Sequence, residues 1–494
     1  MSAARLSSLV SEAGLRPEAQ TGDAGVEWAT ADSRAVRAGS LFVCMPSKST
    51  DTHGYLEAAK AEGAVAAVAH SSDGFARAVS LGLAAVWFPP TQPVFNVSVA
   101  KLVRGVFRDP STAMRVVGVT GTNGKTTTAW MLRDALRAMG RKASYMGTLG
   151  FDPGGNRREL ANTTPFPVET WQLLQEARLN GVQDFVMEAS SHALYERRLA
   201  GVRFEVGVFT NLSQDHLDFH RDMEDYASAK RLLFTEYAEL AGGEFRSAIN
   251  VGDPVGARWV AEFGTTVAIG RDLLVTALEK SVSTLVLSAS YRDVTREFRI
   301  GVGGTFNVWN ATSALGALLA MGYILDESVL AMEHVTPVPG RFESVPTGRG
   351  FSVIVDYAHT DDALEKLLQS VRELQPGRII TVFGCGGDRD KSKRPKMARA
   401  ASENSDVTVV TSDNPRTEDP EAIIADVVKG LVAGREATTV VDRREAVGRA
   451  VGLARDGDVI VIAGKGHEDY QIIGRTKHHL DDRELVRDAL EVVA

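Results

Sequence analysis

The sequence has little cysteine, no long apolar run and no excess of basic residues. Only two of its 494 residues are cysteines, Cys44 and Cys385, and they form no metal-ligand pattern. We therefore expect reduced thiols, as is usual in the cytoplasm. No stretch approaches the roughly 20 apolar residues of a membrane span, and charges and proline interrupt the start of the chain where a signal peptide needs an apolar core. These absences predict a soluble cytoplasmic protein without membrane insertion.

The charge balance bears on the class of partner. The 55 basic and 63 acidic residues give a formal net charge of −8, which argues against non-specific binding to nucleic acid or anionic membranes. The 44% hydrophobic and 24% charged residues are typical of globular proteins, and no internal repeat or low-complexity tract is present. We therefore expect small-molecule substrates and no nucleic-acid partner.

The length predicts roughly three domains, and two proline-containing segments could link them. "FRDPSTAM" (107–114) precedes a strong apolar strand, and "HVTPVPGRFE" (334–343) precedes four apolar runs separated by helical stretches. Strand and helix patterns alternate on both sides of each linker, which is typical of α/β domains with parallel sheets. The predicted domains are residues 1–106, 107–335 and 336–494.

The strongest local signal is "GTNGKTT" (121–127), which lies between a predicted strand and a predicted helix. Backbone N–H groups of such a glycine-rich turn bind phosphate oxygens, and the positive end of the helix reinforces them. The pattern differs from the usual phosphate loop because Val119 replaces its first glycine, and a purely structural turn is the alternative. The predicted ATP-binding residues are Gly121, Thr122, Asn123, Gly124, Lys125, Thr126 and Thr127, with Lys125 on the β- and γ-phosphates.

Candidate metal ligands follow this loop in the chain. Glu188 ends the predicted strand in "DFVMEASSHAL", and "SQDHLDFHRDMEDYASAK" contains His216 and Lys230. A structural histidine or a solvated charged face would explain each residue taken alone. Together with the hydroxyl of Thr126, the set favours a Mg²⁺ site.

Three polar loops each follow an apolar run in the last predicted domain. They are "FGCGGDRD", "TSDNPR" and "AGKGHED". Since the carboxyl ends of parallel strands meet at one edge of a sheet, we expect the loops to meet where a ligand binds. An ordinary turn remains the alternative for Arg416, because Asn-Pro pairs often initiate turns.

The order and spacing of these motifs resemble those of the Mur ligases, the ATP-dependent amide-bond-forming enzymes of bacterial cell-wall precursor synthesis. The resemblance spans residues 118 to 471 through "GVTGTNGKTTT", "NTTP", "MEASSHAL", "FNVWN", "PGRFE", "VDYAHT", "DNPR" and "GKGHEDYQ", and "ADSR" with "GSLFV" is similar to the family's first domain. It implies a small UDP-binding α/β domain, a central phosphate-loop α/β domain and a carboxyl-terminal Rossmann-like α/β domain. The motifs are most similar to those of members that add meso-2,6-diaminopimelate to the D-glutamate of UDP-MurNAc-L-Ala-D-Glu.

The resemblance also implies roles for residues that spacing alone does not assign. Asn307 and Asn310 would lie near the adenine of ATP, Asp356 near its ribose and Arg341 on its γ-phosphate. The matching lysine of similar enzymes is carbamylated by CO₂, so Lys230 would be an N6-carboxylysine beside the second of two Mg²⁺ ions. The residues expected to bind the UDP-MurNAc-dipeptide are Ser33, Asn162, Thr163, Thr164, Ser190 and Arg198.

Diaminopimelate differs from lysine by one carboxylate, and the guanidinium fork of arginine can bind a carboxylate through two parallel bonds. In the resembling family, "DNPR" marks the diaminopimelate users. The residues expected to bind diaminopimelate are Arg389, Asp413, Asn414, Pro415, Arg416, Gly464 and Glu468, with Glu468 on the distal ammonium. Asp361 departs from the family pattern, since relatives commonly have proline there.

Several alternatives remain at this point. The same ligation could use L-lysine or L-ornithine, or the chain could resemble folylpolyglutamate synthetase, which also couples ATP to the addition of an amino acid. A non-catalytic nucleotide switch would use the phosphate loop for binding only. We expect a monomer with ATP as co-substrate and Lys125, Glu188, His216, Lys230 and Arg341 as the catalytic residues.

Overall fold

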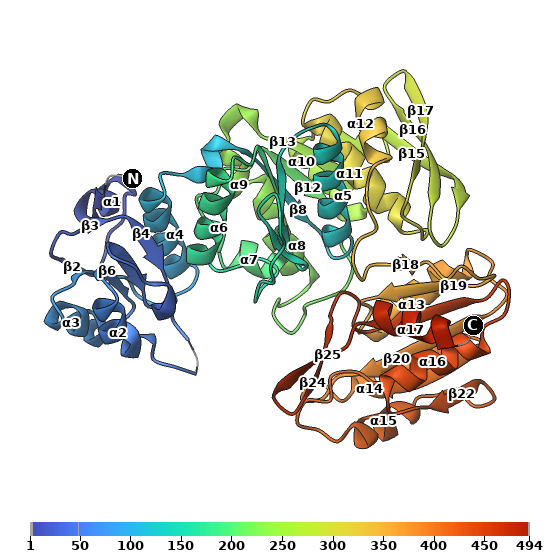
Figure 1. Ribbon diagram of the computed structural model, residues 1–494. Coiled ribbons are helices and arrows are strands. Elements are labelled where there is room, and N and C mark those ends of the chain that lie inside the picture. Colours follow the sequence, from blue (N-terminus) through green and yellow to red (C-terminus); the bar gives the residue numbers. More distant parts are fainter. Residues whose placement is uncertain (1–2, 48, 493–494) are drawn as a thin grey trace. The chain divides into compact units, whose positions relative to one another are not determined.

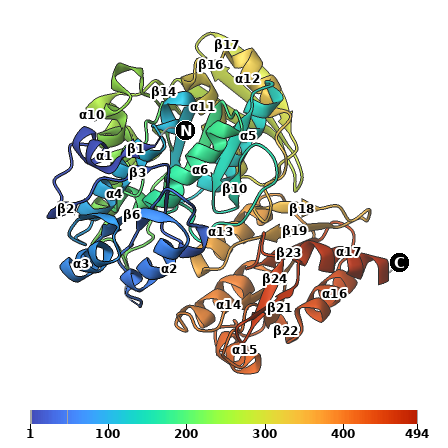
Figure 2. The ribbon, with the colours of Figure 1, turned by 60° about the vertical axis from the view of Figure 1, so that its left-hand side comes forward.

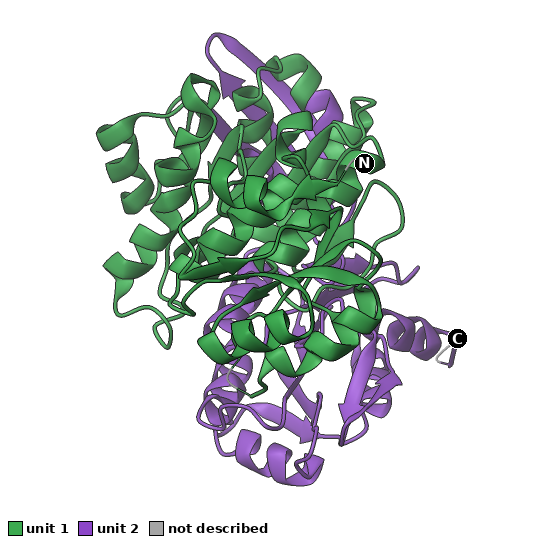
Figure 3. Cartoon of the chain, turned by 90° about the vertical axis from the view of Figure 1, so that its left-hand side faces the viewer, with its two compact units in different colours: residues 1–273, 313–328 green, residues 274–312, 329–494 purple. Residues whose placement is uncertain are grey.

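The computed structural model of the protein describes residues 3–47 and 49–492. It divides into two compact units, residues 1–273 with 313–328 and residues 274–312 with 329–494 (Figure 3). The chain passes between the units within helix α11 (Asn307–Ala320).

The first unit begins with a five-stranded sheet of order β2-β7-β6-β5-β4, in which only β2 is antiparallel to its neighbour. Alternate side chains of β5 enter two different apolar clusters, since Leu41 and Val43 face one and Phe42 and Cys44 the other. Helices α2 and α3 cover one face of this sheet, and α1 and α4 the other (Figure 1, Figure 2). The elements are β1 (Ala4–Arg5), α1 (Leu6–Glu12), β2 (Ala19–Thr21), β3 (Gly25–Val26), β4 (Trp28–Thr30), β5 (Ser40–Val43), α2 (Leu56–Ala61), β6 (Ala64–Ala69), α3 (Ser72–Ser80), β7 (Ala84–Trp87) and α4 (Val94–Val106).

The rest of the first unit is built on strands in the order β10-β9-β11-β8-β12-β13-β14. Only β10 is antiparallel to its neighbour, and α5 packs against β8, β9 and β11. Helix α4 packs on α6, so one apolar cluster runs through both sheets of the unit. The elements are β8 (Arg115–Thr120), α5 (Lys125–Ala138), β9 (Ala143–Gly147), β10 (Gly150–Asp152), α6 (Pro167–Leu179), β11 (Asp184–Glu188), α7 (Ser191–Tyr195), β12 (Val206–Phe209), α8 (Met223–Arg231), α9 (Glu236–Glu239), β13 (Arg246–Asn250), α10 (Pro254–Phe263) and β14 (Val267–Ile269).

The second unit contains a six-stranded sheet of order β18-β19-β23-β20-β21-β22, parallel except for β18. Apolar residues of α13, α14 and α15 cover one face, and those of α16 and α17 the other. The unit's elements are β15 (Leu273–Lys280), β16 (Leu285–Tyr291), β17 (Val294–Ile300), α12 (Leu325–Met332), β18 (Glu343–Val345), β19 (Ser352–Asp356), α13 (Asp361–Arg372), β20 (Ile379–Cys385), α14 (Lys393–Asn404), β21 (Val407–Ser412), α15 (Pro420–Val428), β22 (Glu436–Thr439), α16 (Arg443–Leu453), β23 (Val459–Ala463), β24 (Tyr470–Ile473), β25 (Thr476–His479) and α17 (Asp482–Val492), although residues of β15 and α12 also fall in the first unit.

The predicted α/β class is confirmed, because the sheets are largely parallel and helices cover their faces. The boundaries at residues 106/107 and 335/336 stay predictions. Across the described residues, no helix combines the length and apolar character that crossing a bilayer requires.

Candidate functional site

The predicted phosphate loop connects β8 to α5 in the first unit. Gly121 has φ 147° and Gly124 has φ 83°, in the region that favours glycine. A Cβ atom on Gly121 would lie 1.9 Å from Oγ1 of Thr210, so a side chain there would collide with the neighbouring strand end. The loop therefore follows a glycine-dependent path into the positive end of α5, which suits a phosphate.

Two lysines converge on one carbonyl group of this loop. Nζ of Lys125 donates to the carbonyl oxygens of Gly121 at 3.1 Å and Thr122 at 2.8 Å. Nζ of the buried Lys230 donates to the same Gly121 oxygen at 2.8 Å. Burial lowers the pKa of Lys230 well below its usual value, and the Lys125 cation lowers it further. The site therefore weakens the protonated form of Lys230 relative to that of a solvated lysine.

Glu188 is fully buried at the end of β11 and accepts hydrogen bonds only from neutral groups. Its donors are the hydroxyl of Tyr145 at 2.6 Å, the hydroxyl of Thr126 at 3.1 Å, and the amide and hydroxyl of Thr148 at 2.8 and 3.2 Å. Within residues 3–47 and 49–492 no lysine or arginine forms an ion pair with it. Burying a carboxylate without a cation is costly, so the Glu188 carboxylate suits the role of a ligand to Mg²⁺.

No pattern in the sequence indicates Tyr145 or Thr148 as functional residues. Tyr145 lies in the buried strand β9, where an aromatic residue is expected to pack in the hydrophobic core, and Thr148 lies in the turn that follows. Gly147 between them allows the contact, since a Cβ there would lie 2.2 Å from Oε1 of Glu188. Only the pairing of β9 with β11 brings these residues to the carboxylate.

His216 lies in the segment between β12 and α8 with φ 53°. Its ring is 4.8 Å, centroid to centroid, from that of His192. Burial lowers the pKa of His216, and the cations of Lys125 and Lys230 lower it further against the opposing effect of Asp215. The imidazole is therefore held in the neutral form that binds metals.

Residues predicted to bind the muramoyl-dipeptide adjoin Glu188. The Thr164 hydroxyl donates to the carbonyl of Glu188 at 2.8 Å and accepts from the amide of Ser190 at 3.2 Å. Arg198 donates to the carbonyl of Thr164 at 3.1 Å, and the hydroxyls of Thr163 and Thr148 are 3.2 Å apart. Among the described hydrogen bonds, none joins Ser33 or Asn162 to this group.

In the second unit, residues predicted to bind ATP form two separate groups. Nδ2 of Asn310 donates to Oδ1 of Asn307 at 2.7 Å at the start of α11. At the end of β19, the Asp356 carboxylate accepts from the amides of Phe342 and Ala358, and burial raises its pKa while Arg341 opposes the rise. Nε of Arg341 is buried with no hydrogen-bond partner, which suits a residue that binds an anionic ligand.

The three loops predicted to bind the amino acid lie at one edge of the second unit's sheet, after β20, β21 and β23. Arg416 has φ 52°, and its Nη1 donates to the Gly387 carbonyl at 2.9 Å. No acceptor for its Nε or Nη2 occurs in the described part of the chain. Its backbone bonds Ile472 and Gly474, so the β24–β25 hairpin fixes the strained residue in place.

At the same edge of the sheet, a contact that includes charged groups joins two of the loops. Nδ2 of Asn414 donates to Oε2 of Glu468 at 2.9 Å, and Nζ of the fully buried Lys465 lies 3.3 Å from the same oxygen. Oδ1 of Asn414 accepts from Lys465 and from the amide of Ile472. The sequence had not indicated Lys465, because one lysine in a glycine-rich loop gives no spacing signal.

The remaining predicted residues of this edge differ in exposure. Asp413, Asn414 and Pro415 are buried, and a Cβ on Gly464 would lie 2.7 Å from Oδ2 of Asp413. Arg389 is exposed and makes no hydrogen bond or ion pair with the described residues. Arg389 and two nitrogens of Arg416 are thus available to an anion.

Comparison with known proteins decides the family. Residues 119–318 match the Mur ligase middle domain, and residues 340–466 match the Mur ligase glutamate ligase domain. The chain is 42% identical over 499 residues to a UDP-N-acetylmuramoyl-L-alanyl-D-glutamate–2,6-diaminopimelate ligase of Gloeobacter violaceus, with 99% of both chains covered. The chain belongs to the Mur ligase family.

Further relatives agree with this assignment. A ligase of the same name from Geobacter metallireducens is 40% identical over 491 residues and covers 94% of each chain. A solved structure of a ligase of this name matches this Mur ligase with a TM-score of 0.65 and 30% identity, covering 95% of each chain. A folylpolyglutamate synthase of Mycobacterium tuberculosis matches only 75% of the chain at 19% identity, with a TM-score of 0.61, and shares the fold alone.

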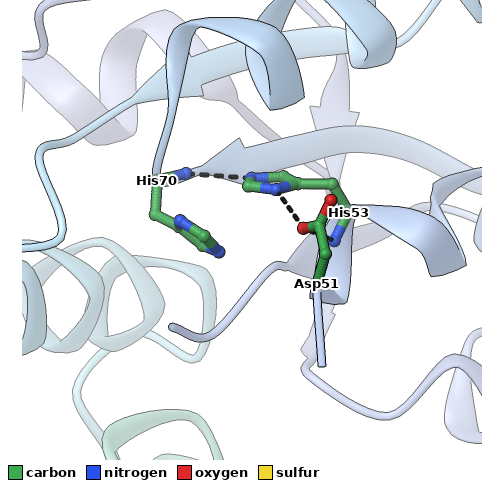
Figure 4. Close-up of side chains that lie close together, drawn as sticks. All are labelled: Asp51, His53 and His70. Carbon is green, nitrogen blue, oxygen red and sulfur yellow. Dashed lines mark hydrogen bonds and ion pairs between the residues drawn. The ribbon is translucent and has the colours of Figure 1, made fainter. Parts of the chain in front are cut away.

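This Mur ligase also brings together Asp51, His53 and His70, whose potential ligand atoms lie within 4.8 Å of one another (Figure 4). Nδ1 of His53 is 2.7 Å from Asp51, and its Nε2 accepts from the backbone amide of His70 at 3.2 Å. Since Nε2 accepts, Nδ1 carries the proton and donates to Asp51. Both nitrogens are occupied, and a Cβ on Gly74 would touch the ring at 2.1 Å, so His53 packs as a structural residue.

Proposed function

We propose that this Mur ligase joins meso-2,6-diaminopimelate to the D-glutamate of UDP-MurNAc-L-Ala-D-Glu, with ATP converted to ADP and phosphate. The observation that carries the proposal is Arg416: the β24–β25 hairpin holds its backbone, Nη1 donates to the Gly387 carbonyl, and Nε and Nη2 are unpaired by the described residues. The names of the relatives from Gloeobacter and Geobacter support the same substrates.

The reaction must first activate a carboxylate, which is a poor electrophile. Transfer of the γ-phosphoryl group of ATP to the side-chain carboxylate of the D-glutamate breaks one P–O bond, forms another and releases ADP. The phosphate loop orients the triphosphate, and Lys125 compensates the charge on the transferring group. Arg341 is assigned to the γ-phosphate, which agrees with its buried, unpartnered Nε.

Thr126, Glu188, His216 and a carbamylated Lys230 would hold Mg²⁺, with two ions proposed. When bound, Mg²⁺ supplies positive charge that stabilises the phosphoryl oxygens. The lowered pKa of Lys230 raises the fraction of the neutral amine that reacts with CO₂. A carbamate would also replace the repulsion between the protonated form of Lys230 and Lys125 at this carbonyl by attraction. Buried Glu188, bonded only to neutral donors, has the charge that such a site needs.

The second step is attack of the diaminopimelate amine on the acyl phosphate, which expels phosphate and forms the amide. Arg389, Asn414 and Arg416 would bind a carboxylate of the amino acid, and Glu468 its distal ammonium. Asp413, Pro415 and Gly464 complete the pocket as backbone and packing elements. A ligand lacking the carboxylate would leave Arg416 desolvated without an anion, which penalises lysine.

The other assignments belong to the same proposal. Asn307, Asn310 and Asp356 would bind the adenosine, and Ser33, Asn162, Thr163, Thr164, Ser190 and Arg198 the UDP-MurNAc-dipeptide. We further propose a cytoplasmic monomer of three domains, residues 1–106, 107–335 and 336–494.

The test is ADP formation from ATP with UDP-MurNAc-L-Ala-D-Glu and each of meso-diaminopimelate, L-lysine and L-ornithine. We expect turnover only with all three substrates present, and a strong preference for diaminopimelate. Better use of lysine or ornithine would contradict the role of Arg416. Turnover with a folate and glutamate would indicate a folylpolyglutamate-synthetase-like ligase instead. Binding of ATP without turnover would indicate a non-catalytic nucleotide switch.

A further inference from the structure

Helices α16 and α17 of the second unit each begin with a charged residue that is completely buried. Arg443 opens α16, Asp482 opens α17, and both side chains have no exposed surface. Nε and Nη2 of Arg443 donate to the two carboxylate oxygens of Asp482, each at 2.7 Å. The two helices pack side by side on the sheet (Figure 1).

The guanidinium also reaches the ends of two strands. Nη1 of Arg443 donates to the carbonyl of Ser412 at 3.3 Å, and Nη2 to the carbonyl of Ala463 at 3.1 Å. Ser412 is the last residue of β21 and Ala463 the last of β23, and β20 lies between these strands in the sheet. The next residues along the chain, Asp413 and Gly464, begin two of the loops assigned to the amino acid.

Stability alone does not account for a buried cation at this position. The amino-terminal end of a helix is its positive end, so Arg443 opposes the dipole of α16. Asp442 already caps that helix by accepting from the amide of Glu445 at 3.0 Å. Buried ion pairs can often be replaced by apolar residues of similar volume without loss of stability, because desolvation offsets their attraction.

The electrostatic surroundings connect the pair to the loops. Burial disfavours the charge of Arg443, yet its pKa is raised because Asp482 and, in addition, Asp413 and Glu468 attract the cation. Both of the latter carboxylates belong to the loops that follow β21 and β23. One guanidinium therefore bonds the strand ends and attracts the acidic side chains beyond them.

We propose that Arg443 and Asp482 are positioning residues that set the relative placement of the two loops and thereby the choice of amino acid. The contact they maintain is that between Asn414 of one loop and Glu468 of the other, at 2.9 Å. The inference rests on the proposed function, because that function assigns these loops to diaminopimelate. Neither residue touches the reacting atoms.

The experiment compares the full-length wild-type enzyme with Arg443→Met/Asp482→Leu, which removes both charges but keeps a filled core. Arg443→Lys is the conservative variant; lysine keeps the charge but cannot donate to a carboxylate and two carbonyls in one plane. The control is Arg444→Ala, which removes the neighbouring exposed ion pair with Asp488 between the same two helices. Each enzyme is measured for Tm, for KM of ATP and of meso-diaminopimelate, and for the ratio of kcat/KM between diaminopimelate and L-lysine.

We expect the double variant to keep its Tm within a few degrees, while its KM for diaminopimelate rises about tenfold or more and its preference over lysine falls by a similar factor. Its KM for ATP should stay unchanged. Arg443→Lys should give an intermediate shift, and Arg444→Ala should behave as wild type.

A folded double variant with wild-type KM and wild-type preference would overturn the inference. So would an equal loss of kcat with every amino acid at unchanged KM, because that result indicates a general structural role. If the wild-type enzyme itself prefers lysine, the proposed function fails and the inference fails with it. If the wild-type enzyme prefers diaminopimelate and the variants show the same kinetics, the inference is refuted and the proposed function stands.

Discussion

The phosphate loop of the first unit and the amino-acid edge of the second are built in different ways. The loop motif is one continuous stretch, residues 121–127, that runs from the end of β8 into the first turn of α5, and its geometry follows from Gly121 and Gly124 at positive φ. The edge combines three loops after β20, β21 and β23, and it depends on the hairpin contacts of Arg416 and on the buried pair of Arg443 and Asp482.

This difference separates two kinds of sensitivity to mutation. A site built from one stretch of backbone, such as the phosphate loop, loses function when the few side chains that contact the ligand are removed. Its other contacts come from backbone groups, which a side-chain substitution leaves in place. An assembled site can also lose specificity through residues that never touch the ligand. The first kind of site should fail completely, and the second should change its choice of substrate.

The largest effect is expected from Lys125→Ala. The variant should fold but lose ADP formation by roughly 10²–10³-fold, because Lys125 is the only lysine of the loop and compensates the developing phosphoryl charge. Steady-state ADP release with all three substrates measures this. Lys101→Ala, which removes an exposed lysine from α4 of the same unit, is the control. Normal turnover by Lys125→Ala would refute the phosphate-loop assignment.

A similarly large loss with partial recovery is expected for Lys230→Ala. The variant loses the proposed carbamate, so activity should fall roughly 10²-fold and rise again when short carboxylates are added, since they can replace the missing anion. Lys125→Ala should show no such recovery. Carbon-13 NMR of enzyme equilibrated with labelled bicarbonate should detect the carbamate. An active enzyme with an unmodified Lys230 amine would contradict this prediction.

A moderate and selective effect is expected from Arg416→Ala. KM for diaminopimelate should rise about 10–100-fold and the preference over lysine should fall, with KM for ATP little changed, because one charged hydrogen-bonding partner is lost. Arg435→Ala, at an exposed position of the same unit, should leave all three values unchanged. If the variant instead lost only its affinity for ATP, the assignment of Arg416 to the diaminopimelate site would be wrong.

The smallest effect is expected from Asp361→Pro, which restores the family's usual residue. Asp361 is the first residue of α13, where proline is tolerated, and the preceding Thr360 has φ −126° and ψ 158°, the extended conformation that proline requires before it. The free energy of unfolding should change by less than about 1 kcal/mol, with kinetics unaffected. Denaturant unfolding tests this, and a destabilisation above about 2 kcal/mol would show that the β19–α13 turn has a different geometry in solution.

Much of the architecture could be predicted because apolar runs and glycine positions are local signals. The α/β class and the Mur ligase family are confirmed, and the predicted loops after β20, β21 and β23 do lie at one edge of their sheet. Tyr145 and Thr148 could not be predicted as partners of Glu188. A buried tyrosine in a strand looks the same in the sequence whether its hydroxyl bonds a neighbour or a metal-binding carboxylate.

Residue types alone dictate where the chain makes a phosphate loop, since φ and steric access at Gly121 and Gly124 depend on the residue at each position. The polar residues that follow each strand of the last domain are likewise visible in the sequence. Three features arise only in the folded chain: Lys230 meets Lys125 at one carbonyl, Glu188 lacks a cation among the described residues, and Arg443 joins two strand ends. Desolvation and charge coupling depend on distances in space, and residues from 20 to 109 positions apart acquire those distances only when the sheets assemble.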